Sequence, residues 1–333
     1  MTGGPVPPPP GVPDASPGPP RVSVVVPTYN RAHVLPRALA SVVHQDLVDL
    51  EVIVVDDGST DATPAVADAF PDPRIAWITA PHGGVVAARN RALAVARGEW
   101  LAFLDDDNEW LPTHLSGLVD AAERTGADAV SGLAVEVGPD GSRVPQGPPP
   151  AADLLVAAAR FGWAPFASCV LARRSLVARV GGFLEHPPRG EDRHLWIRVA
   201  LAGRWDFVSA TTMVRHADAG VRLTDDDGAI RRVHVEIERE FRRPVRRRVG
   251  RRAATVWYRR VWRNGDCRDL IARVRREGRG VAWRLVGDLA RGLPASAPLL
   301  GRPLAVGLLG VDRYERGRDY YHGFHVRART VRR

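Results

Sequence analysis

Three carboxylates in a row, Asp105, Asp106 and Asp107, directly follow an apolar run at residues 100–104. Carboxylates this close repel one another unless a cation or a polar ligand lies among them. The run has the composition of a buried strand, and open α/β sheets bind ligands at the carboxyl ends of their strands. The cluster therefore indicates a site for a cation or a polar ligand. The alternative is a solvated turn that follows the strand.

A second acidic cluster follows the apolar run at residues 51–55. Asp56 and Asp57 come directly after this run, and Gly58 permits a tight turn behind them. A carboxylate at a strand end can accept a hydrogen bond from a base N–H or a ribose hydroxyl, and we assign this role to Asp57. The alternative is that these acids only cap helices and close turns, which is our interpretation of Asp61.

Amide, glycine and arginine residues are expected near the same edge. Asn30 ends the first β-branched run and is the expected N-cap of the helix that follows. The sequence His82-Gly83-Gly84 opens a helix that carries Arg89, so backbone amides can approach an anion there and Arg89 can add a planar donor fork. Taken alone, Arg89 is more typical of a surface cation. The absence of a GxGxxG or Walker sequence argues against a dinucleotide fold and a P-loop.

Asp192 is the candidate for acid–base chemistry. At helical spacing it shares a face with Leu195 and Val199. A carboxylate on an apolar face is costly unless it is partnered or performs chemistry. The alternative is an acid that complements the helix dipole at the N-terminus. His216 follows an expected strand at residues 207–214, and a lone histidine is more often structural than a ligand.

These side chains need a scaffold of alternating strands and helices. Short apolar runs bounded by turn residues predict strands, and amphipathic periodicity between them predicts helices. This alternation implies a largely parallel sheet covered on both faces. The expected strands are residues 21–27, 51–55, 75–79 and 100–104, and the expected helices lie near 34–42, 65–69 and 85–96.

A second region follows the last of these strands. We place its end near Gly228, after which the pattern becomes an arginine-dense helix with scattered aromatic residues. The region is expected to contain strands at 129–137, 167–171 and 207–214, a Gly/Pro-rich loop at 138–150, a short helix at 151–160 and a helix from about 191 to 201.

The charge is unevenly distributed along the chain. Residues 1–228 carry 19 Arg against 28 Asp and Glu, whereas residues 229–333 carry 28 Arg against 10. All 47 basic residues are Arg, which is typical of a GC-rich coding sequence, so the count alone overstates functional intent.

The composition also bears on the compartment. Cys169 and Cys267 lack the spacing of a zinc site and indicate no disulfide framework, so we expect a reducing compartment. The first twenty residues contain nine prolines and no apolar signal-peptide core, which predicts a disordered leader. The sequence contains no uninterrupted run of eighteen apolar residues, so we expect no membrane span.

Together the motifs resemble those of the family 2 glycosyltransferases, inverting enzymes with a GT-A fold. The resemblance covers roughly residues 21–223. Each string is weak alone, but seven in the family's order make a specific match. They are PTYNR at 27–31, VVDDGSTD at 54–61, ARNRAL at 88–93, FLDDDNEWLP at 103–112, GGF at 181–183, GEDRHLWIRVA at 190–200 and RH at 215–216.

The resemblance implies how a nucleotide-sugar donor is bound. Thr28 and Asp57 would hold the base, with Arg89 contributing nearby, and Asp106 would contact the ribose. The implied fold is an α/β GT-A fold, a Rossmann-like mixed sheet, followed by a basic helical extension. The donor expected from this family is of the UDP or dTDP type.

The resemblance also implies a metal site and a base. Asp105 and Asp107 are the outer residues of the family's DXD motif, and Asp107 is the more direct ligand of Mg²⁺ or Mn²⁺. In some relatives a histidine at the position of His216 completes the metal site. Asp192, the second acid of the ED pair, corresponds to the catalytic base. One base suffices, because a single displacement inverts the anomeric carbon while a cation neutralises the leaving diphosphate.

Two residues depart from the family pattern. His194 stands where the family often has an acid, two residues after the ED pair, and Pro36 interrupts the usual start of the first helix. Neither touches the implied chemistry, although His194 would alter contacts with the acceptor.

The expected organisation has three parts: a disordered Pro-rich leader at 1–20, a GT-A domain at 21–228 with a nucleotide-binding half at 21–128 and an acceptor half at 129–228, and an Arg-rich helical extension at 229–333. The expected acceptor is a glycan or a lipid-linked sugar of cell-envelope polysaccharide synthesis. Because such acceptors are often lipid-linked, we expect a cytoplasmic protein with peripheral contact to anionic lipid on the inner membrane face rather than to nucleic acid. Arginine-rich helices that simply pack on the catalytic domain are the alternative.

Two other functional classes stay open. A sugar nucleotidyltransferase also joins a nucleotide to a metal-bound carboxylate cluster, but it would carry a Gly-rich basic loop after the first strand, where this chain has PTYNR. The second is a non-catalytic relative that binds membrane or nucleic acid through the basic extension.

Overall fold

The computed structural model describes only part of the chain. The described residues are 18–138, 140–146, 154–155, 164–185, 190–216, 237, 240–241 and 243–250. The predictions for most of the leader and for residues 251–333 lie outside them. Of the helix predicted at 151–160, the two described residues, Leu154 and Leu155, are helical.

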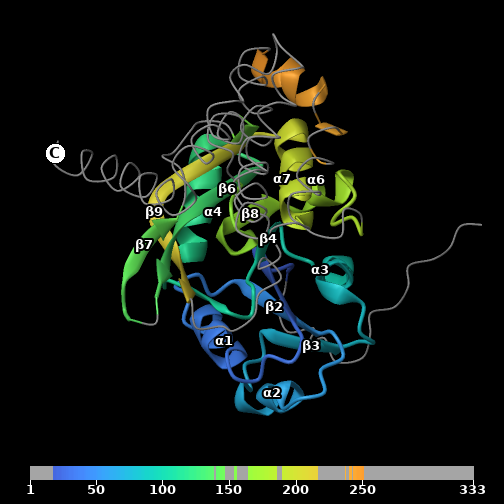
Figure 1. Cartoon of the computed structure of the whole chain (residues 1–333), viewed down its shortest axis with the longest axis vertical. Helices are drawn as coiled ribbons and strands as arrows, with labels where there is room; N and C mark the ends of the chain where they lie inside the picture. The colour runs from blue at the N-terminus through green and yellow to red at the C-terminus, as the bar shows by residue number, and fades with distance from the viewer. Residues whose placement is uncertain are drawn as a thin grey trace, which may run out of the picture. The chain divides into compact units, whose positions relative to one another are not determined.

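The described part of the chain forms one mixed sheet flanked by helices (Figure 1). The strands run in the order β3-β2-β1-β4-β8-β6-β9-β5, and β7 pairs with β6 off this path. The strands are β1 (Val22–Thr28), β2 (Leu50–Asp56), β3 (Ile75–Thr79), β4 (Trp100–Phe103), β5 (Asn108–Trp110), β6 (Ala129–Val137), β7 (Arg143–Gln146), β8 (Val170–Arg173) and β9 (Trp205–His216). The helices are α1 (Leu35–Val43), η1 (Thr63–Ala65), α2 (Val66–Ala69), α3 (Gly84–Val95), α4 (His114–Thr125), η2 (Ala167–Cys169), α6 (Arg174–Arg179) and α7 (Glu191–Ala202).

The first four strands are parallel, as the alternation of strands and helices predicts. β1 pairs with β2 on one side and β4 on the other, and β2 pairs with β3. The carboxyl ends of β1, β2 and β4 therefore lie side by side. This arrangement brings the sequences that follow them, which include Tyr29, Asp57 and Asp105, to one edge of the sheet.

The second half of the sheet is mostly antiparallel. β8 pairs antiparallel with both β4 and β6, and β5 pairs antiparallel with β9, whereas β6 and β9 are parallel. The strand predicted at 167–171 was partly wrong, since a 3-10 turn precedes β8. The loop predicted at 138–150 contains β7, an exposed edge strand whose Pro145 hid its pattern. β5 and α4 were not predicted.

The sheet separates two apolar layers. Alternate residues of β1, such as Val24 and Val26, join one cluster with buried residues of α1 and α4. The other face of the sheet is covered by α3 and by an aromatic group. In this group, Phe103 of β4 makes edge contacts with Trp196 of α7 and with Phe183, which precedes α7. The helices that carry Arg89 and Asp192 therefore lie on the same face of the sheet.

The start of α1 corrects one prediction. Asn30 is not its N-cap: the helix begins at Leu35, after Val34. Asn30 adopts a left-handed backbone with φ of 53°, and its Oδ1 accepts a hydrogen bond from the Thr60 N–H at 2.8 Å. Pro36 lies in the first turn, where a helix leaves N–H groups unpaired, so it does not interrupt α1.

Candidate active site

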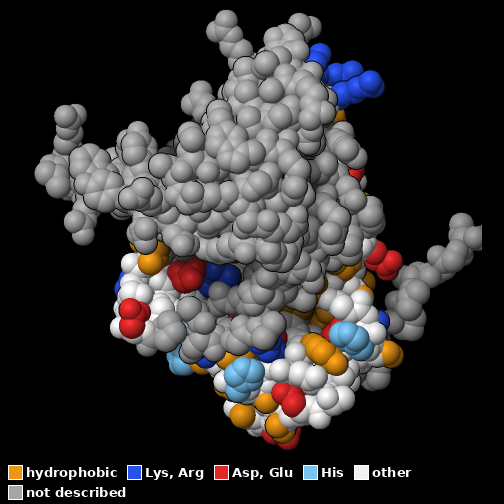
Figure 2. All heavy atoms as spheres, in the orientation of Figure 1, with side chains coloured by type: hydrophobic (Ala, Val, Ile, Leu, Met, Phe, Trp, Pro, Cys, Tyr) orange, Lys and Arg blue, Asp and Glu red, His pale blue; other side chains and the backbone are white. Residues whose placement is uncertain are grey.

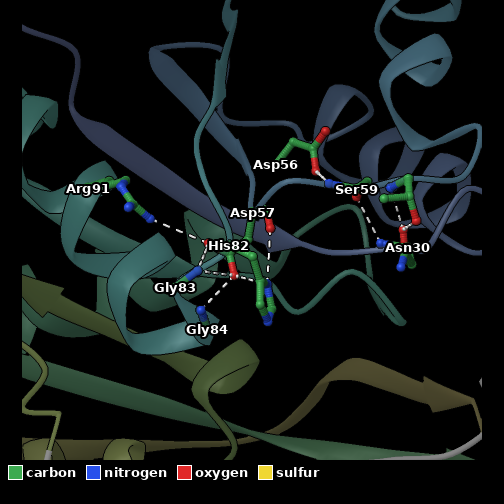
Figure 3. A network of polar contacts seen from close by, with 9 residues as sticks. Asn30, Asp56, Asp57, Ser59, His82, Gly83, Gly84 and Arg91 are labelled. Atoms are coloured by element: carbon green, nitrogen blue, oxygen red, sulfur yellow. Dashed lines mark hydrogen bonds and ion pairs between the residues drawn. The ribbon is translucent and has the colours of Figure 1, made fainter.

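Asp57 lies at the centre of a polar network at the N-terminus of α3 (Figure 3). Its side chain is buried, and its carboxylate accepts hydrogen bonds from the Gly83 N–H at 3.0 Å and the Gly84 N–H at 2.7 Å. His82 Nδ1 lies 2.8 Å and Arg91 Nη1 3.4 Å from the same carboxylate. The anion that we expected at this helix terminus is thus the protein's own carboxylate, which suits the helix dipole.

The turn after β2 is held by local hydrogen bonds. The Ser59 N–H donates to Asp56 Oδ1 at 2.9 Å, and the Thr63 N–H donates to Asp61 Oδ1 at 2.9 Å (Figure 3 shows the first of these contacts). Asp61 therefore closes a turn onto the first residue of η1 but is not its N-cap, which is Ala62. Burial would raise the pKa of Asp61, but several side-chain and backbone hydrogen bonds together lower it below its ordinary value.

An aromatic pair borders this network. The rings of Tyr29 and His82 stack with centroids 4.2 Å apart, and the Tyr29 side chain is exposed. Thr28, which ends β1 and precedes Tyr29, is buried. Flat exposed rings next to a hydrogen-bonding carboxylate are the usual ingredients of a base-binding surface. The sequence reading missed this pair, because nothing in the sequence brings Tyr29 and His82 together.

The three carboxylates after β4 lie in unequal surroundings. The Asp105 N–H donates to Ser168 Oγ at 3.0 Å, so this turn is held from the start of β8. Arg31 Nε lies 3.9 Å from the carboxylate of Asp106. Burial, together with the charges of Asp107 and Asp105, raises the pKa of Asp106 to about 7, while the Thr28 hydroxyl and Arg31 oppose the rise. The repulsion expected from the sequence is therefore present at this edge.

Arg89 joins the donor side of the site to the helix that carries Asp192. It is 4% exposed, so the interpretation of Arg89 as a surface cation was wrong. Its Nη2 lies 2.8 Å from Asp105 Oδ1, and its Nη1 lies 2.8 Å from Glu191 Oε1. Burial alone would lower the pKa of Arg89, but Asp105, Glu191 and Asp192 together raise it above its ordinary value. Arg89 is thus a charged guanidinium between two acidic motifs.

Asp192 lies in the first turn of α7, on the side of the buried Leu195. Its Oδ1 accepts a hydrogen bond from the Arg193 N–H at 2.6 Å. Burial and the neighbouring charge of Glu191 raise its pKa to about 7, and Arg89 partly offsets this rise. A carboxylate with this pKa suits a general base at neutral pH. Position and pKa are compatible with the role that the resemblance implies.

The metal site implied by the resemblance fits in part. Asp105, Asp106 and Asp107 offer the oxygen ligands that Mg²⁺ and Mn²⁺ prefer. A cation there would oppose the effects of burial and of the neighbouring carboxylates, which together raise the pKa of Asp106. His216 instead contacts Glu109, with Nε2 and Oε2 2.7 Å apart, because β9 pairs with β5. Within the described ranges, no group of three or more His, Cys, Asp or Glu side chains is placed to hold a metal ion.

A helical segment near residue 240 contacts α7 beside the site. Glu240 Oε2 lies 2.9 Å from His194 Nε2, and the Phe241 ring meets the His194 ring edge-on at 4.9 Å. Ile237, Phe241 and Val245 are buried at helical spacing. His194, which departs from the family pattern, therefore holds the segment that follows the catalytic domain. No helix in the described part of the chain is long and apolar enough to cross a membrane.

The fold has solved counterparts in the GT-A class. The chain is similar to the mannosyltransferase PcManGT from Pyrobaculum calidifontis, solved with GDP-Man and Mn²⁺, at 21% identity and a TM-score of 0.56 over 90% of each chain. It is also similar to S. aureus TarS 1-349 solved with UDP-GlcNAc, at 21% identity and a TM-score of 0.55, over 89% of this chain and 92% of that one. At these identities the likeness establishes the fold alone, which is the GT-A fold.

Part of the chain matches a known sequence family. Residues 23–176 match the family described as Glycosyl transferase family 2. It is 43% identical to the succinoglycan biosynthesis protein ExoO of Rhizobium meliloti over 118 residues, which is 35% of this chain and 34% of ExoO. It is 38% identical to the Escherichia coli UDP-Glc:alpha-D-GlcNAc-diphosphoundecaprenol beta-1,3-glucosyltransferase WfgD over 95 residues, 28% of this chain and 38% of WfgD. The matches thus span about a third of these relatives.

Proposed function

We propose that the protein is an inverting glycosyltransferase that moves a sugar from a nucleotide-diphosphate donor to a hydroxyl of a glycan or lipid-linked acceptor. One observation carries this proposal. Arg89 draws the donor-side carboxylate Asp105 and the base-side residue Glu191 to within 2.8 Å of one guanidinium. A displacement reaction needs exactly these two functions on neighbouring walls of one site.

The donor side would consist of the network around Asp57 and the carboxylates after β4. Asp57 and the Tyr29–His82 pair would contact the base, and Asp106 the ribose. A divalent cation on Asp107 and Asp105 would supply the positive charge that the leaving diphosphate requires. UDP- or dTDP-type donors are our expectation, and solved proteins of this fold carry UDP-GlcNAc and GDP-Man.

The base side would consist of the first turn of α7. Asp192 would take the proton from the acceptor hydroxyl as it attacks the anomeric carbon on the face opposite the leaving group, which inverts that carbon. With its pKa raised to about 7, Asp192 binds the released proton well and is still largely ionised at slightly alkaline pH. The name of WfgD describes a diphosphoundecaprenol acceptor, and we propose a lipid-linked acceptor of that kind for this chain.

Calorimetry tests the donor site. We expect UDP to bind the full chain more tightly with Mn²⁺ than with chelator, and we expect the metal effect to be lost in Asp107→Ala. A screen of nucleotide sugars for metal-dependent hydrolysis then identifies the donor without knowledge of the acceptor. Equal UDP affinity with and without metal would refute the metal assignment. Formation of pyrophosphate-dependent products instead would favour a sugar nucleotidyltransferase.

We further propose that the basic segment after the catalytic domain contacts anionic lipid on the cytoplasmic membrane face. Arg243, Arg246, Arg247 and Arg248 are all exposed, while Val245 is buried, so this helical segment has one basic face and one packed face. Figure 2 shows basic side chains gathered over this segment, which Figure 1 draws in orange. Each basic residue near an anionic bilayer contributes about 1 kcal/mol, so a few suffice.

Liposome sedimentation tests the lipid contact. The full chain should pellet with anionic vesicles at low salt, and replacing the four exposed arginines by Gln should reduce the bound fraction. Neutral vesicles and high salt serve as controls, because the attraction is screened within a Debye length. Equal pelleting of both proteins, or equal binding to neutral vesicles, would refute this contact.

A further inference from the structure

The Arg89 guanidinium lies between two carboxylates that come from motifs 102 and 16 residues away in sequence. We propose that Arg89 is a positioning residue that holds the base-bearing helix α7 against the donor carboxylates, and that it is not a ligand of the nucleotide. This inference rests on the proposed function, because it assigns Asp192 and Asp105 the roles given there.

The contacts of the guanidinium carry the proposal. One terminal nitrogen is 2.8 Å from Asp105 and the other is 2.8 Å from Glu191, so both ends of the fork are already engaged by protein. A planar fork can bind two carboxylates at once with fixed geometry, whereas a lysine ammonium acts as a point charge. Contact with a nucleotide would require Arg89 to release one of these acids.

The packing around Arg89 restricts its movement. Arg89 Cζ lies 5.1 Å from the centre of the Phe183 ring. The next residue, Asn90, donates to the Phe183 carbonyl at 2.8 Å and accepts from the Phe183 N–H at 3.1 Å. Phe183 in turn makes an edge contact with Trp196 of α7, with ring centroids 6.3 Å apart. Helix α3 thus contacts α7 directly through Arg89, and indirectly through Asn90 and Phe183.

Charges from three elements face the base. Glu191 and Arg193 flank Asp192 on α7, Arg89 approaches from α3, and Asp105 approaches from the end of β4. Glu191 and Asp105 disfavour ionisation of Asp192, and Arg89 is the charge from another element that favours it. Removing the guanidinium therefore leaves the acids to repel one another, which should both loosen the first turn of α7 and make Asp192 harder to ionise.

The test compares four full-length proteins: wild type, Arg89→Gln, Arg89→Lys and the control Arg97→Gln. Arg97, two residues after the end of α3, pairs with Glu51 at 3.0 Å, so the control removes a more exposed ion pair away from the site. The first measurement is the titration of the Asp192 carboxyl by ¹³C NMR, assigned by its loss in Asp192→Asn. The second is UDP affinity by calorimetry with Mn²⁺, and the third is the pH profile of metal-dependent donor turnover.

We expect Arg89→Gln to raise the pKa of Asp192 by about one unit. One nearby charge produces a shift of this size at intermediate dielectric. Arg89→Lys should shift it less, and Arg97→Gln should not shift it. UDP affinity should stay within about threefold in all four proteins, while donor turnover by Arg89→Gln falls by about tenfold to a hundredfold because the base is misplaced.

Two results would overturn the proposal, and two others are resolved by a second measurement. An unchanged Asp192 titration in Arg89→Gln would overturn the proposal, and so would a loss of UDP affinity beyond about tenfold, which would make Arg89 a nucleotide ligand. If Arg89→Gln fails to fold by circular dichroism, the same measurements on Arg89→Lys decide, since a shift is still expected there. If the wild type itself does not bind UDP, the proposed function fails, whereas the NMR titration still tests the link between Arg89 and Asp192.

Discussion

The part of the site that we propose to bind the nucleotide, the nucleotide half, and the part that we propose to bind the acceptor, the acceptor half, hold their charged groups by different means. In the nucleotide half, the carboxylate of Asp57 is bound by the backbone amides of Gly83 and Gly84. In the acceptor half, Glu191 and His216 are bound by side chains more than a hundred residues away, Arg89 and Glu109. Backbone amides survive any side-chain substitution around them, whereas a side-chain pair is lost with one residue. The Asp57 carboxylate would therefore keep its two backbone donors if His82 or Arg91 were substituted, whereas the contact between Arg89 and Glu191 is lost with either residue.

The largest expected effect lies in the acceptor half. Asp192→Asn should leave UDP affinity unchanged, because Asp192 lies outside the Asp57 network, but it should lower the rate of transfer by about a hundredfold or more. The measurement is single-turnover transfer at saturating donor, with calorimetry of UDP on the same protein. Transfer near the wild-type rate would place the base elsewhere and would remove the functional distinction between the two halves.

The reverse pattern is expected for the nucleotide half. Asp57→Ala leaves the amides of Gly83 and Gly84 without their buried acceptor, which costs about 2 kcal/mol of unfolding free energy. UDP affinity should fall by about tenfold, a typical loss for one charge-assisted hydrogen bond. The Asp192 titration should not move. Urea unfolding and calorimetry measure these effects, and Asp57→Asn is the matched variant, because it keeps one acceptor oxygen and should lose less.

The parts of the fold that sequence could predict are those in which pattern and local chemistry agree. β3 and β6 have exactly the predicted bounds, and α7 extends one residue beyond its predicted end. These segments are continuous apolar runs or strongly periodic ones. β5 is too short to show a pattern, and it exists because β9 is there to pair with it. α4 was not predicted, although its buried residues Leu115, Leu118 and Ala122 recur at helical spacing.

The sequence could likewise predict one part of the site but not another. The side chains that end β1, β2 and β4 could be placed on one edge, because parallel strands bring their carboxyl ends together. The pairing of Arg89 with Glu191 could not be placed, because it depends on how far α7 lies from α3 after the intervening strands have packed. One signal was present: an arginine and an acid each stand within an apolar helix face, and such charges are expected to find each other when buried.

A third prediction uses pH to compare the halves. Asp192 has a pKa of about 7, and it must be ionised to accept a proton. The value of kcat/KM should therefore rise with pH up to about 7, falling by about tenfold for each pH unit below it. UDP binding through the amide-held Asp57 should vary less over pH 7 to 8. The pH profiles of turnover and of UDP affinity test this. In Asp192→Asn, turnover should no longer depend on pH in this range. A profile of turnover that is flat between pH 5.5 and 8 would contradict the role of Asp192.

The smallest expected effect concerns His216, whose metal role is the least supported by its contacts. Its Nε2 lies 2.7 Å from Glu109, a partly exposed ion-pair partner that a metal ion would have to displace. An exposed pair of this kind is worth about 0 to 1 kcal/mol, so Glu109→Gln should raise Mn²⁺ affinity in the presence of UDP by about threefold if His216 is a ligand. His216→Ala should then lower that affinity, and the double variant should match His216→Ala, because the acid matters only through the histidine. If Glu109→Gln and His216→Ala both leave Mn²⁺ affinity unchanged, the metal is held by the carboxylates after β4 alone, and the pair of β5 and β9 is structural.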